Sequence, residues 1–121
     1  MDEKPHRRLT VWMKAMDFVI QVHEVTARFP AAEKFGMVSQ MRRAALSIPS
    51  NIAEGSARKG RKEYVRFLYT SRGSLSELDT QVEVAARLRY ISPKTAGELQ
   101  SKLDELSRML NGLIGALSRD D

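Results

Sequence analysis

The chain has 121 residues, a formal net charge of +5 at pH 7, a sequence pI of about 9.8 and no cysteine. Its length suits a single domain, and the lack of cysteine excludes disulfide bonds, thiolate nucleophiles and cysteine-ligated zinc. No apolar run is long enough for a signal-peptide core or a membrane span, so we expect a cytoplasmic protein that has no contact with a membrane.

The first predicted helix runs from about Thr10, the expected N-cap, to Arg28. Pro30 ends it, because a proline moves the residue before it out of the helical region. Its main apolar face holds Trp12, Ala15, Met16, Val19, Val22 and Phe29. Other large apolar residues lie off this face, at Val11, Met13, Phe18, Ile20 and Val25. A monomeric bundle rarely exposes so many apolar groups on a second face, so this helix predicts a homo-oligomer.

The second predicted helix begins between Glu33 and Gly36, and Gly55 is the expected residue beyond its C-terminus. Its apolar stripe consists of Val38, Met41, Ala45, Ile48 and Ile52. Pro49 lies inside this pattern, where it removes a backbone N–H and crowds the carbonyl four residues earlier. We therefore expect a kink or a break over residues 46–49.

Polar residues surround this proline, and we interpret them as groups that satisfy the disturbed turn. Ser47, Ser50 and Asn51 are placed for this role, and Asn51 and Glu54 have the spacing of a capping box. A serine beside asparagine and glutamate is also compatible with nucleophilic catalysis, but neither histidine has a reason to lie near enough to act as the base. We expect no catalytic residues and no enzyme activity.

The third predicted helix covers about residues 61–89, with Gly60 as its N-cap and Glu63 in the first turn, where the helix dipole favours an acid. Its buried face is predicted to hold Tyr64, Phe67, Leu68, Ser71, Leu75, Leu78, Val82 and Ala85. Gly73 weakens the helix by about 1 kcal/mol relative to alanine. We interpret this glycine as a place where another helix approaches closely.

Ser92 as N-cap and Pro93 at the first helical position predict the start of the fourth helix. Its leucines alternate steps of four and three residues, as in a coiled-coil seam: Leu99, Leu103, Leu106, Leu110, Leu113 and Leu117. Four amphipathic helices joined by short loops predict an all-α, up-down four-helix bundle. The expected boundaries are a basic N-terminal tail at 1–9, a bundle domain at 10–118 and a C-terminal tail at 119–121.

The positive charge is concentrated in one part of the chain. Between Arg42 and Arg72 there are eight basic and two acidic residues, a surplus of six, whereas the whole chain has a surplus of five. Such a concentration favours a polyanionic partner through Coulomb attraction and counterion release. The predicted phosphate contacts are Arg42, Arg43, Arg58, Lys59, Arg61, Lys62 and Arg66, and a smaller basic group lies at Lys4, Arg7 and Arg8. The alternative interpretation is a solvated face that only keeps the protein soluble.

If the second and third helices are antiparallel neighbours, Arg42 lies far from Arg58, and a continuous patch requires the kink or a neighbouring subunit. Among the nearby aromatic residues, Tyr69 lies off the buried stripe and is the predicted base-stacking residue. His6 and His23 are far apart and have no carboxylate pair at ligand spacing. No glycine-rich phosphate loop is present, so neither a metal nor a cofactor is predicted.

The run from Arg42 to Gly55, RRAALSIPSNIAEG, resembles the signature of the 23S rRNA intervening-sequence protein family, also called the four helix bundle protein family. The resemblance continues through residues 63–69, EYVRFLY, and 73–81, GSLSELDTQ, and covers about residues 9–117. One departure is Gly60, where the family often has a serine as the N-cap of the third helix.

The family resemblance implies a small bacterial bundle that assembles into a homopentameric barrel, with no established biochemical function. A distant relative is the accessory protein of diversity-generating retroelements, described as a pentamer that binds nucleic acid and a reverse transcriptase. The implied partners are further copies of the chain, RNA or DNA, and a reverse transcriptase or another protein. We therefore expect a non-enzymatic, homo-oligomeric accessory protein that binds RNA. The alternative is a protein–protein interaction scaffold with no nucleic-acid role.

Overall fold

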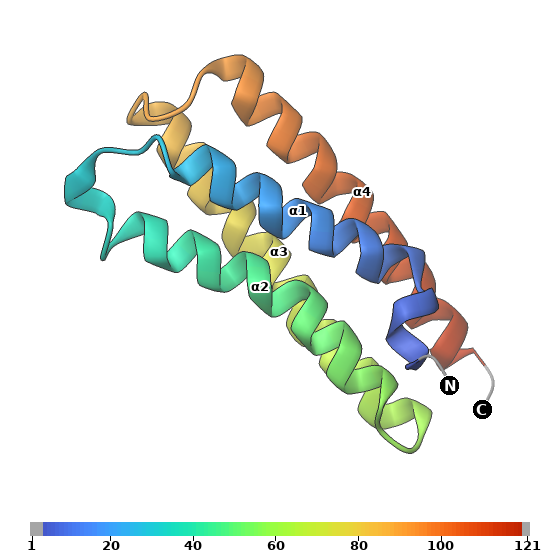
Figure 1. Cartoon of the computed structure of the whole chain (residues 1–121). Coiled ribbons are helices and arrows are strands. Elements are labelled where there is room, and N and C mark those ends of the chain that lie inside the picture. The colour runs from blue at the N-terminus through green and yellow to red at the C-terminus, as the bar shows by residue number, and fades with distance from the viewer. Residues whose placement is uncertain (1–3, 120–121) are drawn as a thin grey trace.

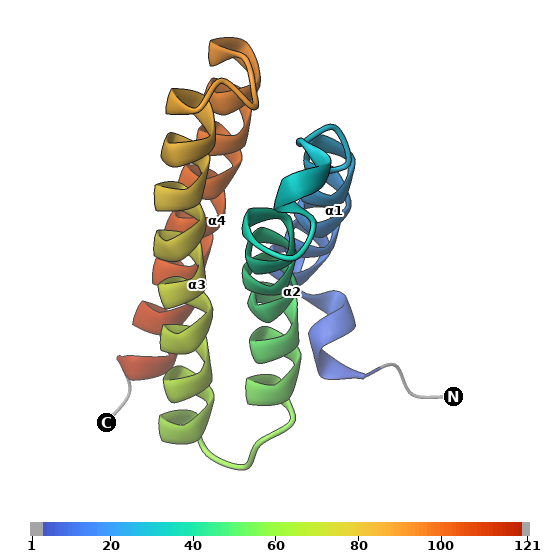
Figure 2. The same cartoon turned by 90° about the vertical axis from the view of Figure 1, so that its left-hand side faces the viewer.

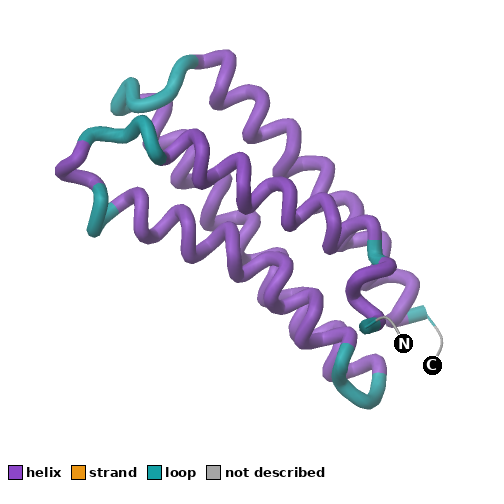
Figure 3. The backbone as a smooth tube through the Cα atoms, in the orientation of Figure 1, coloured by secondary structure: helices purple, strands orange, loops and turns teal. Residues whose placement is uncertain are grey.

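The computed structural model describes residues 4–119, and over this range the fold is all-α, with no β-strand. Its elements are η1 (Pro5–Arg8), α1 (Thr10–Thr26), η2 (Ala31–Glu33), α2 (Met37–Ser56), α3 (Arg61–Arg87) and α4 (Pro93–Ser118), where η denotes a short 3-10 helix. Figure 1 shows the long helices, and Figure 3 shows the short loops between them. The predicted class, four helices without strands, is confirmed for the described part of the chain.

Consecutive long helices run in opposite directions and lie next to one another (Figures 1 and 2). α2 packs on α3, α3 packs on α4, and α1 lies against α2 and, less extensively, against α4. One core fills the space between them, and its fully buried large side chains include Phe18, Met41, Ile48, Leu78 and Leu106. The α2–α3 loop, η1 and the C-terminal end of α4 lie at the same end of the bundle (Figure 2).

α1 buries apolar residues that the sequence pattern placed outside the core. Val11 and Phe18 are buried, because α1 contacts two helices and its buried arc is therefore wider than one stripe. Leu9 rather than Thr10 occupies the N-cap position, without a side-chain hydrogen bond, and the helix ends at Thr26. The large apolar residues that remain exposed on α1 are Met13 (44%), Met16 (38%) and Ile20 (58%).

α2 continues through Pro49 without interruption and buries its predicted stripe. Of the predicted kink or break, the break is absent, and Figure 1 shows a change in the direction of the α2 axis near its middle. Side chains of α3 contact α2 at this point. The Ser71 hydroxyl donates to the Ile48 carbonyl at 2.9 Å. The Ser74 hydroxyl donates to the Ser47 hydroxyl at 2.9 Å. These contacts stabilise α2 where its backbone lacks one N–H.

Gly55 and Asn51 have roles that differ from the predicted ones, because α2 extends to Ser56. Gly55 is buried inside the helix, where its missing side chain allows α3 to approach. The Asn51 amide donates to the carbonyl oxygen of Ser47 at 2.8 Å and to its hydroxyl at 3.0 Å. Asn51 therefore does not cap a helix, and the predicted capping box does not form.

α3 and α4 begin where the local sequence signals predict. Gly60 is the N-cap of α3 and has a φ of 92°, a left-handed conformation that favours glycine. At the start of α4, the Ser92 hydroxyl accepts a hydrogen bond of 3.1 Å from the Thr95 N–H. Gly73 is exposed, and no atom lies within 4 Å of where its Cβ would stand. The close helix approach predicted there does not occur within residues 4–119.

Candidate nucleic-acid interface

The α2–α3 loop and the helix ends beside it gather five of the seven basic residues that the sequence predicts as phosphate contacts. These are Arg58, Lys59, Arg61, Lys62 and Arg66, and all five are exposed. We name this set the basic hairpin. The positive φ of Gly60 allows the chain to reverse from α2 into α3 over residues 57–60, so the five cations lie at one end of the bundle.

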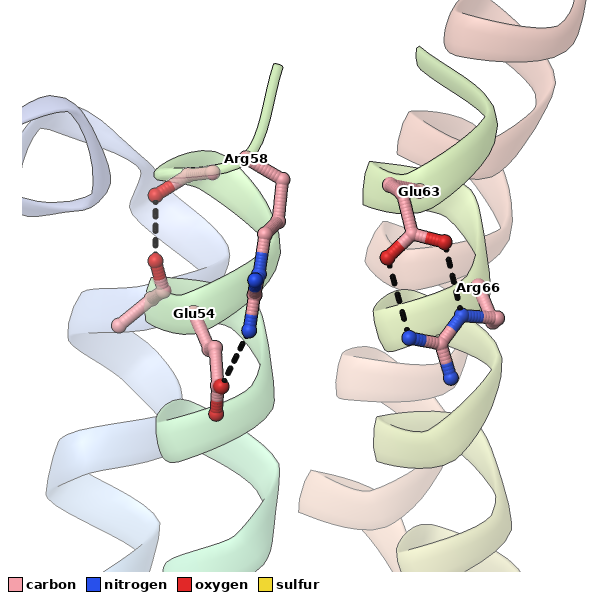
Figure 4. Close-up of polar contacts among 6 residues, drawn as sticks. Glu54, Arg58, Glu63 and Arg66 are labelled. Atoms are coloured by element: carbon pink, nitrogen blue, oxygen red, sulfur yellow. Dashed lines mark hydrogen bonds and ion pairs between the residues drawn. The ribbon is translucent and has the colours of Figure 1, made fainter. Parts of the chain in front are cut away.

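Two arginines of the basic hairpin are positioned by carboxylates and by one aromatic ring. Arg58 pairs with Glu54 at 2.8 Å, as Figure 4 shows. Arg66 donates two hydrogen bonds, of 3.0 and 3.1 Å, to the carboxylate of Glu63 (Figure 4). The two guanidinium carbons lie 5.0 and 4.9 Å from the centre of the Phe67 ring, within the range of a cation–π contact. Both arginine side chains stay accessible, at 47% and 64% exposure.

The pairing of Glu63 with Arg66 keeps both groups charged. The hydrogen bond from Arg66 lowers the pKa of the Glu63 carboxyl below its usual 4.5, and the same bond raises the pKa of Arg66. Glu54 and Glu63 are the acidic residues between positions 54 and 66, against five basic ones. This segment therefore has a surplus of three positive charges at neutral pH.

The first turn of α3 contains two basic residues, although positive charge at this end of a helix is destabilising. Arg61 and Lys62 lie in the first turn, next to the positive end of the helix dipole, where acids such as Glu63 are the stabilising residues. The dipole and the basic hairpin together create a positive potential at this end of the bundle. Such a potential attracts anions, and phosphate groups above all.

Arg42 and Arg43 do not join the basic hairpin. Arg42 donates from Nε to the Thr26 hydroxyl at 3.0 Å and from Nη2 to the His23 carbonyl at 3.2 Å, so it binds the C-terminal end of α1. Arg43 is exposed on α2. The chain between Arg42 and Arg58 corresponds to roughly 24 Å of helix. Although α2 bends, its two ends still lie far apart (Figure 1).

Tyr69 is exposed on α3, with 47% of its surface accessible. The guanidinium of Arg72 lies over its ring, 4.5 Å from the centre, and Nη1 of Arg72 donates to Oδ1 of Asn111 on α4 at 3.0 Å. Tyr64 and Phe67 are half-buried, and burial raises the pKa of Tyr64 above 10.0. The hydrogen bond that positions Arg72 could not be predicted from the sequence, because its partner Asn111 is 39 residues further along the chain.

A second basic group lies at the same end of the bundle. η1 contains Arg7 and Arg8 and packs against α1 and α2 (Figure 2). The Arg7 guanidinium lies 5.5 Å from the centre of the Trp12 ring, and the His6 ring meets the same indole edge-on at 4.9 Å. Residues 5–8 of the predicted tail are therefore folded onto the bundle, where they add positive charge at the same end as the basic hairpin.

Ser47, which precedes Pro49 by two residues, contributes to the packing of α2 on α3, whereas Ser50 is exposed. The hydroxyls of Ser47, Ser71 and Ser74 all make hydrogen bonds between these two helices. Within the described range, no three histidine, aspartate or glutamate side chains gather as ligands for a metal ion. Over the same range, no helix combines the length and the apolar character needed to cross a bilayer.

Comparison with known proteins gives one family and a similar fold. A profile of the 23S rRNA-intervening sequence protein family matches residues 7–112. No curated protein matches the chain in sequence. A solved structure of a protein of unknown function from the S23 ribosomal protein family of Bacteroides thetaiotaomicron is similar, with a TM-score of 0.78 and 20% sequence identity. The match covers 87% of this chain and 98% of that protein, and at this identity it shows a shared fold.

Proposed function

We propose that this chain, which belongs to the 23S rRNA-intervening sequence protein family, binds nucleic acid through the basic hairpin, and that RNA is the preferred ligand. In this proposal the protein is a homo-oligomer and has no enzymatic activity. The observation that carries the proposal is the position of Arg61 and Lys62 in the first turn of α3. The helix dipole disfavours cations there. A bound phosphate group would offset that cost, because it places negative charge at the same helix end.

The geometry of the basic hairpin suits phosphate groups. Arg58 and Arg66 are already positioned by their carboxylates and by the Phe67 ring, so they lose less conformational freedom when a ligand binds. Guanidinium groups offer paired donors that match phosphate oxygens. RNA stands first among the ligands because the family is named for intervening sequences of 23S rRNA.

The outer face of α1 supports the homo-oligomer. Met13, Met16 and Ile20 follow one another at steps of three and four residues and are all exposed, and Leu46 on the neighbouring α2 is 55% exposed. Exposed apolar groups in such a row are typical of an interaction surface, and a second copy of the chain is its proposed occupant. A ring of copies, such as the pentamer that the resemblance implies, repeats the basic hairpin and raises avidity for a long polyanion.

The test is an anisotropy titration of a labelled structured RNA at several salt concentrations. We expect tight binding whose logarithm falls linearly with the logarithm of the salt concentration, with a slope that counts the phosphate contacts. Lys59→Glu combined with Lys62→Glu should weaken binding by about tenfold or more. The matched control is Lys34→Glu combined with Lys94→Glu, which changes the net charge equally at the other end of the bundle.

Two results would contradict the proposal. Equal losses in the two double variants would mean that RNA responds to net charge and not to the basic hairpin. No binding even at low salt would remove the nucleic-acid role. The oligomer is tested separately by light scattering, where a mass of 13.7 kDa at micromolar concentration would identify a monomer. Ile20→Glu should reduce the mass if the outer face of α1 is the interface.

A protein–protein scaffold is the second candidate, and Phe35 favours it. This residue is 89% exposed in the α1–α2 loop, at the opposite end of the bundle from the basic hairpin. The Lys34 ammonium lies 5.4 Å from the centre of its ring. Aromatic side chains are frequent anchors of protein interfaces. If RNA does not bind, a protein partner whose binding is lost in Phe35→Ala supports the scaffold.

A further inference from the structure

One exposed face of α3 continues the basic hairpin along the bundle. Lys62, Arg66, Tyr69, Gly73 and Ser76 follow one another at steps of four and three residues, and all of them are exposed. From Lys62 to Ser76 the face is roughly 21 Å long. It begins with cations, has an aromatic ring in its middle and carries small side chains beyond the ring.

The ring of Tyr69 is held in position with one of its faces covered. The Arg72 guanidinium lies 4.5 Å from the ring centre, and the same arginine is tied to Asn111 of α4 by a hydrogen bond of 3.0 Å. Because Arg72 bridges two helices, the ring and the guanidinium have a defined mutual position before any ligand binds. Aromatic rings and guanidinium planes are the surfaces on which proteins stack unpaired bases.

Gly73 leaves the space beside this ring open. On a helix, the side chain of residue i+4 lies next to that of residue i, so a side chain at position 73 would cover Tyr69. No atom lies within 4 Å of where a Cβ on Gly73 would stand, so the glycine serves no close helix contact within residues 4–119. A glycine weakens an exposed helix interior. Access to the Tyr69 ring is a role that the geometry offers for it.

The charge along α3 changes sign near this ring. The part before Gly73 holds four basic residues against one acid, namely Arg61, Lys62, Arg66 and Arg72 against Glu63. The part after it holds three acids against one basic residue, namely Glu77, Asp79 and Glu83 against Arg87. A phosphate chain is therefore attracted as far as the ring and repelled beyond it.

From these observations we propose that Tyr69, Arg72 and Gly73 form a stacking platform for an unpaired base, and that the nucleic acid bound by this protein is single-stranded along α3. The inference rests on the proposed function and specifies the form of its ligand. The phosphates of the strand lie on the basic hairpin, and one base stacks on the free face of the Tyr69 ring.

The test uses three labelled ligands in anisotropy titrations with the full chain: a single-stranded RNA of about 12 nucleotides, an abasic strand of the same length, and a duplex of the same sequence. The single strand should bind on the order of tenfold more tightly than the abasic strand, since stacking adds to an equal number of phosphate contacts. It should also bind more tightly than the duplex. Tyr69→Ala should abolish the difference between the two single strands, and Tyr69→Phe should retain it.

Gly73→Leu separates stacking from folding, because it fills the space beside the ring while strengthening the helix. It should lose the preference for the base-containing strand although its melting temperature rises. Gly97→Leu is the matched control, because Gly97 is also exposed in a helix with no atom within 4 Å of its Cβ position. This control should keep the preference.

The outcomes distinguish the platform from the proposed function. Equal binding of the base-containing and abasic strands by the unmodified protein would overturn the platform and leave phosphate binding intact. A preference that survives in both Tyr69→Ala and Gly73→Leu would also overturn it, since the base would then stack elsewhere. Failure of all three ligands to bind at low salt would overturn the platform and the proposed function together.

Discussion

Gly55 of α2 and Phe67 of α3 lie so close together that a Cβ atom on Gly55 would stand 2.9 Å from the Cβ atom of Phe67. The same atom would lie 3.2 Å from the carbonyl oxygen of Tyr64, a backbone atom that cannot rotate away. The missing side chain of Gly55 therefore sets the separation of α2 and α3 at the base of the basic hairpin.

Gly55→Ala is expected to lower the free energy of unfolding by about 1–3 kcal/mol, because the two helices must move apart to admit the methyl group. This loss exceeds the gain from the better helix propensity of alanine. Gly97→Ala is the matched control, with open space around its Cβ position, and it should raise the free energy of unfolding by up to about 1 kcal/mol. Urea denaturation followed by circular dichroism measures both. Stabilisation in both variants would contradict the close approach of α2 and α3.

The starts of α3 and α4 were predictable from local signals, whereas the N-cap of α1 is Leu9 and not the predicted Thr10. Ser92 and Pro93 define the start of α4 through their own capping and backbone chemistry, and Gly60 does the same for α3. The prediction at Gly55 was wrong, and the sequence left a kink and a break equally open at Pro49, because the outcome at both positions depends on α3. Sequence shows a weakened turn and a missing side chain, but it does not show that a neighbouring helix packs against both.

The candidate site shows the same contrast between local features, which the sequence predicts, and contacts between distant residues, which it does not. Counting charges along the chain predicted a basic segment, and the basic hairpin gathers most of it because those residues are close in sequence. The count does not show which arginine already has a partner. Arg42 binds Thr26 and His23, which lie 16 and 19 residues before it, so only the packing of α1 on α2 reveals its role.

Arg42→Lys tests that role while keeping the charge. A lysine ammonium cannot reproduce the two directed hydrogen bonds to the Thr26 hydroxyl and the His23 carbonyl. We expect the free energy of unfolding to fall by about 1 kcal/mol. Arg43→Lys, at the adjacent exposed position, should change it by less than about 0.5 kcal/mol. Chemical denaturation compares the two, and RNA affinity should be unchanged in both. Equal losses would contradict the assignment of Arg42 to the α1–α2 contact.

Glu33 joins two loops at the other end of the bundle. Its carboxylate accepts the Tyr90 hydroxyl at 2.7 Å and, through its other oxygen, the backbone N–H of Met37 at 3.3 Å. The hydrogen bond to Glu33, followed by burial, raises the pKa of Tyr90 above 10.0. Because the folded-state pKa is the higher one, this stabilisation is complete below pH 10.0 and is lost as the pH rises through the folded-state value.

Glu33→Gln is expected to bring the pKa of Tyr90 down towards 10.0 and to lower the melting temperature. The neutral amide is a weaker acceptor for the hydroxyl than the carboxylate is. An NMR titration of ring-labelled tyrosine measures the pKa, and Glu24→Gln, an exposed change on α1, is the control. An unchanged pKa of Tyr90 in Glu33→Gln would show that another group raises it.

Lys14 of α1 and Glu105 of α4 form an ion pair of 3.0 Å, and the hydrogen bond from Lys14 lowers the pKa of Glu105 below 4.5. A lowered folded-state pKa means that this pair stabilises the fold above pH 4.5 and that the stabilisation is lost as the pH falls through the folded-state value. Glu105→Gln should therefore lower the melting temperature at about pH 7 and have a smaller effect in acid, as the pH falls below 4.5 and through the lowered pKa of Glu105. Added salt should reduce the difference at neutral pH, because both side chains are partly exposed. Glu98→Gln on the same helix should have little effect at either pH. A Glu105→Gln effect that is as large in acid as at neutral pH would show that this side chain acts through packing and not through its charge.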